Sequence, residues 1–263
     1  MTGSTAAVAR WPGRDSALIA ARQLRVLRLN PGRLIYPLVQ PVVLLVLFVS
    51  VLGNLSVAHD AAAGAYRQFL IPGIFLQNAA LTAPSTGLGI LRDAASGLAD
   101  RFRSLPMSRS AVLVGRLAGD AVVFAVQAIL LLAVASVLGF RMRTGLPGMA
   151  ATVLVTVSFG IAIAVVSAWL ALLIGDAEAA ERVLFFPAIA ITFLSSAFAP
   201  AGELAGWIRP IARVNPVSAG ADLVRSLAAG GPAAGPLILL GCWLAALVLI
   251  PGMLAVRRWR SPT

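Results

Sequence analysis

The residue types that carry most enzymatic and metal chemistry are almost missing from this chain. Its 263 residues include one histidine, His59, one cysteine, Cys242, and no lysine. A single histidine and a single cysteine cannot build a zinc site or a histidine-based catalytic triad, and a Walker A loop for ATP requires a lysine. We therefore expect no catalytic residue, no metal site and no cofactor in this chain, so that ATP and Mg²⁺, if used, would be bound by a separate chain.

The ten acidic residues lie in places that do not suggest proton or ion chemistry. Asp120 follows Arg116 by one helical turn, which predicts an i,i+4 ion pair near the start of an apolar segment. Asp176, Glu178 and Glu181 cluster in a short break between two apolar segments. Ion-coupled transporters usually need a carboxylate within the membrane, so this pattern argues against a secondary transporter and against an intramembrane hydrolase.

Uncharged polar residues form two stripes at helical spacing inside apolar segments. The stripes consist of Asn78, Thr82 and Ser85 in segment 69–91 and of Thr192, Ser195 and Ser196 in segment 183–200. Such stripes could line a translocation path for a substrate. Small polar residues also hold membrane helices together, and one residue can do both, so the sequence leaves both interpretations open.

The elements that carry these residues are apolar stretches, each long enough to cross a bilayer. The composition is 59% hydrophobic and 12% charged, with a mean hydropathy of +0.92, which is outside the balance of soluble domains. Backbone polar groups in hydrocarbon must be satisfied within the segment, so each stretch is predicted to be a helix. We predict an all-α integral membrane protein with six transmembrane helices in a domain spanning 34–256. The stretches are Leu34–Gly53, Phe69–Leu91, Ser110–Phe140, Gly148–Ile174, Val183–Pro200 and Leu237–Val256.

The net charge of +11 reflects membrane topology better than nucleic-acid binding. With six spans and a cytoplasmic N-terminus, 15 of the 21 arginines fall on the inner side. The positive-inside rule then predicts that both termini are cytoplasmic, including a C-terminal tail at 257–263. The same arginines would attract anionic lipids. A cleaved signal peptide is not expected, because about 30 polar residues precede a first apolar run of about 20 residues.

Two segments on the inner side have an amphipathic pattern. In the N-terminal region 1–33, residues 15–29 alternate apolar side chains with arginines, which predicts a helix on the inner membrane surface; a disordered tail is the alternative. In the inner loop after the second stretch, Leu98, Phe102 and Leu105 recur at helical spacing, and Pro106 ends the run. This pattern predicts a short amphipathic helix presented to the cytoplasm.

The outer connection before the last stretch is also too long and too patterned for a plain loop. Trp207 can anchor at the membrane interface. Asn215-Pro216 precedes an apolar helical pattern that closes at Gly230-Gly231. We predict re-entrant or interfacial helices in this outer segment, which covers about 200–232.

These segments carry a resemblance to a known family. From about residue 16 to its C-terminus the chain resembles the membrane permease subunit of bacterial type-2 ABC exporters, particularly the daunorubicin-resistance-type drug-efflux permeases. Members often carry a glutamate where residues 92–96 here read RDAAS, so no charged contact is assigned there. The motifs are Gly97-Leu98 with DRFRSLP at 100–106, Arg109, Gly115-Arg116, SSAF at 195–198 with Pro200, Trp207-Ile208, Asn215-Pro216-Val217 and DLVR at 222–225.

The resemblance implies a plan of assembly for the chain. Two permease copies, expected to be identical, would pair around a central path in the bacterial cell membrane, and two ATPase subunits would dock beneath them. The inner amphipathic segment, about 93–106, would be the coupling helix that contacts the ATPase. Its implied contact residues are Gly97, Leu98, Arg101, Phe102, Leu105 and Pro106. The implied exit cap is the outer re-entrant segment, with Trp207, Asn215, Pro216, Asp222 and Arg225.

The implied function is efflux of a hydrophobic, drug-like or lipid substrate by a transport subunit that is not itself an enzyme. A permease for a polysaccharide or a lipid-linked glycan is the alternative, since such exporters have a similar architecture. Their paths are typically wide and lined by aromatic side chains, whereas the first, second and fifth stretches here are mostly aliphatic. A membrane-embedded enzyme and a non-transporting scaffold remain as further alternatives.

Overall fold

The computed structural model describes residues 32–55, 60–95 and 109–260, and these residues contain helices and no strand. The apolar runs become helices because hydrocarbon offers the backbone no other hydrogen-bond partner. In chain order the helices are α2 (Gly32–Leu55), α3 (Asp60–Thr82), α4 (Pro84–Ala95), α6 (Arg109–Val137), α7 (Gly145–Ile174), α8 (Ala177–Phe193), α9 (Arg209–Val214), α10 (Pro216–Ala229) and α11 (Ala234–Arg260).

The helices correspond closely to the predicted apolar stretches. Four of the six stretches each fall within a single helix or nearly so, namely α2, α6, α7 and α11. The second stretch is divided between α3 and α4, with a break at Ala83. The fifth stretch is helical only as far as Phe193, where α8 ends. The last helix, α11, continues through Arg260, so residues 257–260 of the predicted tail belong to it.

Three of the described helices are long and apolar enough to cross a membrane: Leu113–Val137 in α6, Gly145–Ile174 and Ala234–Pro251 in α11. The apolar part of α2, Leu38–Val51, is shorter than a usual span. The protein is thus an all-helical integral membrane protein, whereas the number of six spans stays a prediction. The predicted interface helix at 15–29 lies outside the described residues.

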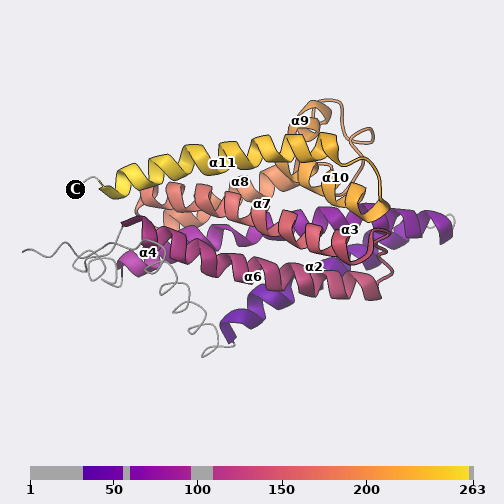
Figure 1. The fold of residues 1–263 in the computed structure, drawn as a ribbon, viewed down its shortest axis with the longest axis horizontal. Helices are drawn as coiled ribbons and strands as arrows, with labels where there is room; N and C mark the ends of the chain where they lie inside the picture. The colour runs from indigo at the N-terminus through magenta and orange to yellow at the C-terminus, as the bar shows by residue number, and fades with distance from the viewer. Residues whose placement is uncertain (1–31, 56–59, 96–108, 261–263) are drawn as a thin grey trace, which may run out of the picture.

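Helix α7 is the central element, because it contacts α3, α4, α6, α8, α10 and α11, and Figure 1 shows it between its neighbours. Its buried face consists mostly of small residues, including Thr152, Thr156, Gly160 and Ser167, with Phe159 as the one large side chain among the buried residues of this helix. Small side chains let neighbouring backbones approach closely in a membrane protein. At Gly160, for example, a Cβ would collide with the ring of Phe124 on α6.

The two ends of the helix bundle are clearly distinguished. In Figure 1 the end of α4 and the C-terminal end of α11 lie at the left, whereas α9 and α10 lie toward the right. At the right-hand end the α6–α7 connection is bonded to α10. There the N–H of Arg143 donates to the carbonyl of Ala228 at 2.8 Å, and Thr144 Oγ1 donates to the carbonyl of Leu227 at 2.7 Å.

Candidate translocation site

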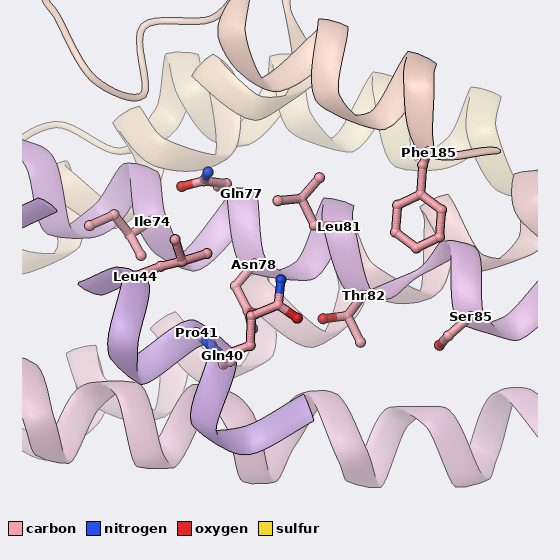
Figure 2. A pocket seen from close by; sticks show the side chains of 10 residues that line it. All are labelled: Gln40, Pro41, Leu44, Ile74, Gln77, Asn78, Leu81, Thr82, Ser85 and Phe185. Atoms are coloured by element: carbon pink, nitrogen blue, oxygen red, sulfur yellow. The ribbon is translucent and has the colours of Figure 1, made fainter. Parts of the chain in front are cut away.

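A pocket of about 190 Å³ lies between α2, α3, α4 and α8 (Figure 2). Its wall is mostly apolar, with several amide and hydroxyl groups and no charged side chain among its lining residues. Such a wall suits a largely apolar ligand that carries a few polar groups. The lining residues are Gln40, Pro41, Leu44, Ile74, Gln77, Asn78, Leu81, Thr82, Ser85 and Phe185.

The structure brings together the first predicted polar stripe in this pocket. Asn78, Thr82 and Ser85 all line it, and Figure 2 shows them following one another along α3 and the start of α4. Asn78 also donates from Nδ2 to Oε1 of Gln127 on α6, over 3.2 Å. Asn78 therefore fits both interpretations of the stripe: it joins α3 to α6, as a packing residue would, and it lines the pocket, as a path residue would.

The position of Thr82 and Ser85 depends on the break between α3 and α4. Proline has no N–H and disfavours helical conformation in the residue before it, so a helix ends readily ahead of Pro84. Ser167 on α7 holds the break: its hydroxyl donates to the carbonyl of Pro84 and accepts from the N–H of Gly87, both at 3.2 Å. A Cβ at Gly87 would collide with Ser167, so only glycine permits this close contact.

The sequence prediction named three of the ten lining residues and did not include the other seven, among them Gln40, Gln77 and Phe185. Gln40 left a signal, because it is a polar residue beside Pro41 within an apolar run, and Figure 2 shows its amide extending from α2 toward α3. Gln77 is 4% exposed, and its Oε1 has no hydrogen-bond partner among the residues that the structure describes. A buried acceptor without a partner is costly, which makes Gln77 the most notable polar group of the wall.

The second predicted stripe does not belong to the lining of this pocket. Thr192, Ser195 and Ser196 are all buried near the end of α8. The hydroxyl of Thr192 donates to the carbonyl of Ala188 at 2.8 Å, and the hydroxyl of Ser195 accepts from the N–H of Ala197 at 3.1 Å. The side chains of Thr192 and Ser195 thus serve the local backbone, whereas the N–H of Ser196 donates to Ser218 Oγ on α10 at 2.8 Å. The place of all three on a translocation path stays a prediction.

The predicted outer segment contains two helices, α9 and α10, and Asn215 joins the second of them to α8. Asn215 Oδ1 accepts from the N–H of Val217 at 2.8 Å, which caps α10 in the usual way for asparagine. Its Nδ2 donates to the carbonyls of Ile191 at 2.7 Å and Leu194 at 3.2 Å. Pro216 begins α10, and Trp207 is 67% exposed ahead of α9, which is compatible with an interfacial anchor.

Arg225 is the centre of the contacts between α10, α3 and the chain after α8. Its guanidinium donates to the carbonyls of Phe69 at 3.0 Å and Ser196 at 2.9 Å, and lies 3.7 Å from the centre of the Phe69 ring. It also pairs with Asp222 at 2.6 Å. Two of the predicted outer residues, Asp222 and Arg225, are therefore directly bonded. Arg225 also supplies hydrogen bonds to the carbonyls of the non-helical residues that follow α8, Ser196 and Ala197.

The six predicted coupling residues, Gly97, Leu98, Arg101, Phe102, Leu105 and Pro106, lie outside the described residues. The structure describes the helices on both sides: α4 continues through Asp93 to Ala95, and α6 begins at Arg109. The predicted pair of Arg116 and Asp120 is present at 4.0 Å, but Arg116 lies nearer to Asp93, at 2.9 Å.

Comparison with known protein sequences gives matches over most of the chain. The sequence model of the family described as ABC-2 type transporter matches residues 16–228. The chain is 33% identical over 215 residues to the probable doxorubicin resistance ABC transporter permease protein DrrC of Mycobacterium tuberculosis, covering 81% of this chain and 76% of that protein. It is 28% identical over 255 residues to the daunorubicin resistance ABC transporter permease protein DrrB1 of Streptomyces coeruleorubidus, covering 95% of this chain and 89% of that protein.

The matched region includes the pocket wall on α2, α3, α4 and α8 and nearly all of α10. Both relatives are named as permeases of ABC transporters that confer drug resistance. The helical membrane fold, the pocket without charged lining residues and these matches agree with one another. This chain belongs to the ABC-2 type transporter family, as a membrane permease of the drug-resistance type.

Proposed function

We propose that this protein is the transmembrane subunit of an ABC exporter that moves a hydrophobic, drug-like or lipid substrate out of a bacterial cell. The pocket between α2, α3, α4 and α8 carries this proposal, because its wall combines apolar side chains with uncharged amides and hydroxyls. Phe185 is the one aromatic residue among its lining residues. This lining favours a hydrophobic substrate over a glycan, for which a wider aromatic wall is expected.

The proposed complex needs two further components. A separate ATPase subunit binds ATP and Mg²⁺ and contacts the inner segment between α4 and α6. A second copy of this chain completes the path. Apolar side chains with large exposed fractions flank the pocket on α2 and α8, and the pairing we propose would bury them together with the pocket. They are Val39, Val43 and Leu47 on α2, exposed by 50–55%, and Phe186, Ile189 and Phe193 on α8, exposed by 44–73%.

The direct test is export by the reconstituted complex. The chain is produced with its ATPase in inverted membrane vesicles, and uptake of doxorubicin is followed by its fluorescence after ATP is added. Doxorubicin is chosen because a relative is named for resistance to it. We expect uptake that stops when the Walker A lysine of the ATPase is replaced. Uptake that persists with the inactive ATPase, or ATPase activity that no hydrophobic compound changes, would contradict the proposal.

The role of the pocket is tested by replacing two of its lining residues with a bulky side chain. Thr82→Trp and Ser85→Trp each place an indole in the space between α2 and α3, and we expect export to fall by about tenfold or more, as for a blocked ligand site. Ile238→Trp is the matched control, since Ile238 is 67% exposed on α11, away from the pocket lining. All three variants are compared at equal amounts in the membrane. Normal export by Thr82→Trp and Ser85→Trp would favour a packing role for the stripe.

A further inference from the structure

Arg116 on α6 makes a set of contacts across α4 that the transport proposal has not yet used. Its Nη1 donates to Asp93 Oδ2 at 2.9 Å, on the last full turn of α4. One turn along α6, Asp120 Oδ2 accepts from Thr86 Oγ1 of α4 at 2.8 Å. Two successive turns of α6 are thereby bonded to two turns of α4. The Arg116 side chain is 16% exposed and that of Asp120 is 17% exposed, so these contacts are partly shielded from water.

Glycine at position 89 shapes the route of the Arg116 side chain. A Cβ at Gly89 would collide with the guanidinium, which lies directly against the α4 backbone. Gly89 sits between Thr86 and Asp93, and the guanidinium passes over α4 at this glycine, whereas the neighbouring Gly87 lies against Ser167 of α7. The Arg116 position is thus determined by shape as well as by charge.

These polar contacts matter because α4 and α6 have few others. Each of the two helices packs mainly against α7, and direct packing of α4 on α6 is sparse. The contacts of Arg116 and Asp120 therefore supply much of the direct connection between them. α4 ends at Ala95 and α6 begins at Arg109. The contact of Asp93 with Arg116 therefore joins the last turn of α4, before the inner segment, to the first two turns of α6, after it.

Arg116 also has a second carboxylate within reach. Within the described part of the chain its Nε has no hydrogen-bond partner, and it lies 4.0 Å from Asp120 Oδ2. Asp120 therefore stands beside the guanidinium on its own helix and is itself bonded to Thr86 of α4. With one carboxylate on each helix, the partly buried charge of Arg116 is paired between α4 and α6, as such a charge requires.

We propose that Arg116 is a positioning residue for energy coupling: it ties the inner ends of α4 and α6 together through Asp93, so that a displacement of the connecting segment moves both helices as one unit. The inference rests on the proposed function, in which an ATPase moves that segment. Ser85 lines the pocket from the first turn of α4, about two turns before Asp93, so movement of α4 reaches the pocket wall directly.

The test is the amount of doxorubicin transported per ATP hydrolysed, measured on the complete complex in proteoliposomes. Arg116→Gln and Asp93→Asn should each lower this ratio by about tenfold, a size common for coupling between distant sites. The double variant should be no worse than the more severe single variant, because both remove the same contact. Arg92→Gln, at an exposed neighbour of Asp93, is the control for loss of charge.

Gly89→Ala tests the same inference without removing a charge. The added methyl group displaces the guanidinium, so this variant should also lower the ratio, whereas Gly241→Ala on α11 meets no atom and should not. Amounts of protein in the membrane are measured in parallel, and Asp93→Asn, at a half-exposed side chain, keeps the test valid if Arg116→Gln is poorly produced.

The outcomes separate the inference from the proposed function. A wild-type complex without ATP-driven transport would contradict the proposed function. A wild-type complex that transports, with Arg116→Gln, Asp93→Asn and Gly89→Ala at the same ratio, would overturn the positioning role alone. Effects of Arg116→Gln and Asp93→Asn that add in the double variant would overturn it as well, since the two residues would then act independently.

Discussion

Gln77 combines burial with an unused hydrogen-bonding atom, and it does so on the wall of the pocket. A buried acceptor without a partner destabilises the protein in which it stands. Strain or unmet bonding is often found where a protein needs it for function. A substrate that donates a hydrogen bond to Gln77 Oε1 would satisfy this atom, and we therefore predict a role for Gln77 in substrate recognition.

Gln77→Leu should therefore have opposite effects on stability and on binding. The apolar side chain removes the unpaired acceptor, so we expect the free energy of unfolding to rise by about 1 kcal/mol. Doxorubicin binding, followed by fluorescence quenching, should weaken. Gln68→Leu is the control, because Gln68 Nε2 already donates to the carbonyl of Gly139 at 3.1 Å. Loss of this hydrogen bond should lower the free energy of unfolding and leave doxorubicin binding unchanged. A less stable Gln77→Leu protein would argue against this role.

At the scale of elements, the junction of α8 and α10 depends on side chains of α10. Arg225→Met keeps much of the length of the side chain but removes its donors to the carbonyls of Phe69, Ser196 and Ala197. We expect the free energy of unfolding to fall by about 2–3 kcal/mol, as for loss of hydrogen bonds to a charged group. Thermal unfolding in detergent measures the change.

The control for Arg225→Met is Arg213→Met, because Arg213 is an exposed arginine in the last turn of α9. It should change stability by no more than about 0.5 kcal/mol, the usual range for surface substitutions. Equal stability of the two variants would mean that the junction does not depend on Arg225.

The sequence predicted helices well where the signal was local, and less well where partners are distant. The apolar runs that became α6, α7 and α11 were found because hydrophobic length alone identifies them. The break at Ala83 was missed, since proline is tolerated inside membrane helices. Ser167, which bonds to Pro84 and Gly87 at this break, lies at least 80 residues away on α7, so no local pattern relates it to them. For Arg116, helical spacing indicated Asp120, whereas the nearer partner Asp93 lies 23 residues away.

The same distinction applies to the pocket. The Asn78 stripe was visible because its residues share one helix face. Gln40 and Phe185 reach the pocket from other helices, and no spacing within one segment relates them to Asn78. Gln77 and Asn78 are adjacent and chemically alike, so only tertiary packing distinguishes the amide that bonds to α6 from the amide that has an unpaired oxygen.

At the scale of the whole molecule, the hydrogen bonds between residues 143–144 and 227–228 place the α6–α7 and α10–α11 connections at the same end. We predict that this end is outside the cell and that the α7–α8 turn is inside. In a Cys242→Ala background, Leu146→Cys and Pro232→Cys should react with a membrane-impermeant maleimide in intact cells. Glu178→Cys should react only after lysis. Labelling of Glu178→Cys in intact cells would reverse the proposed orientation.

The way α10 completes the end of α8 has a consequence for biosynthesis. The carbonyls of Ile191, Leu194 and Ser196 receive their hydrogen bonds from Asn215 and Arg225, which the ribosome adds about 20 to 30 residues later. Until then these carbonyls have no partner in lipid, where an unsatisfied backbone group costs several kcal/mol. The fifth apolar stretch therefore cannot settle fully on its own during insertion, and its outer end must stay in contact with water or with the insertion machinery until α10 has been made.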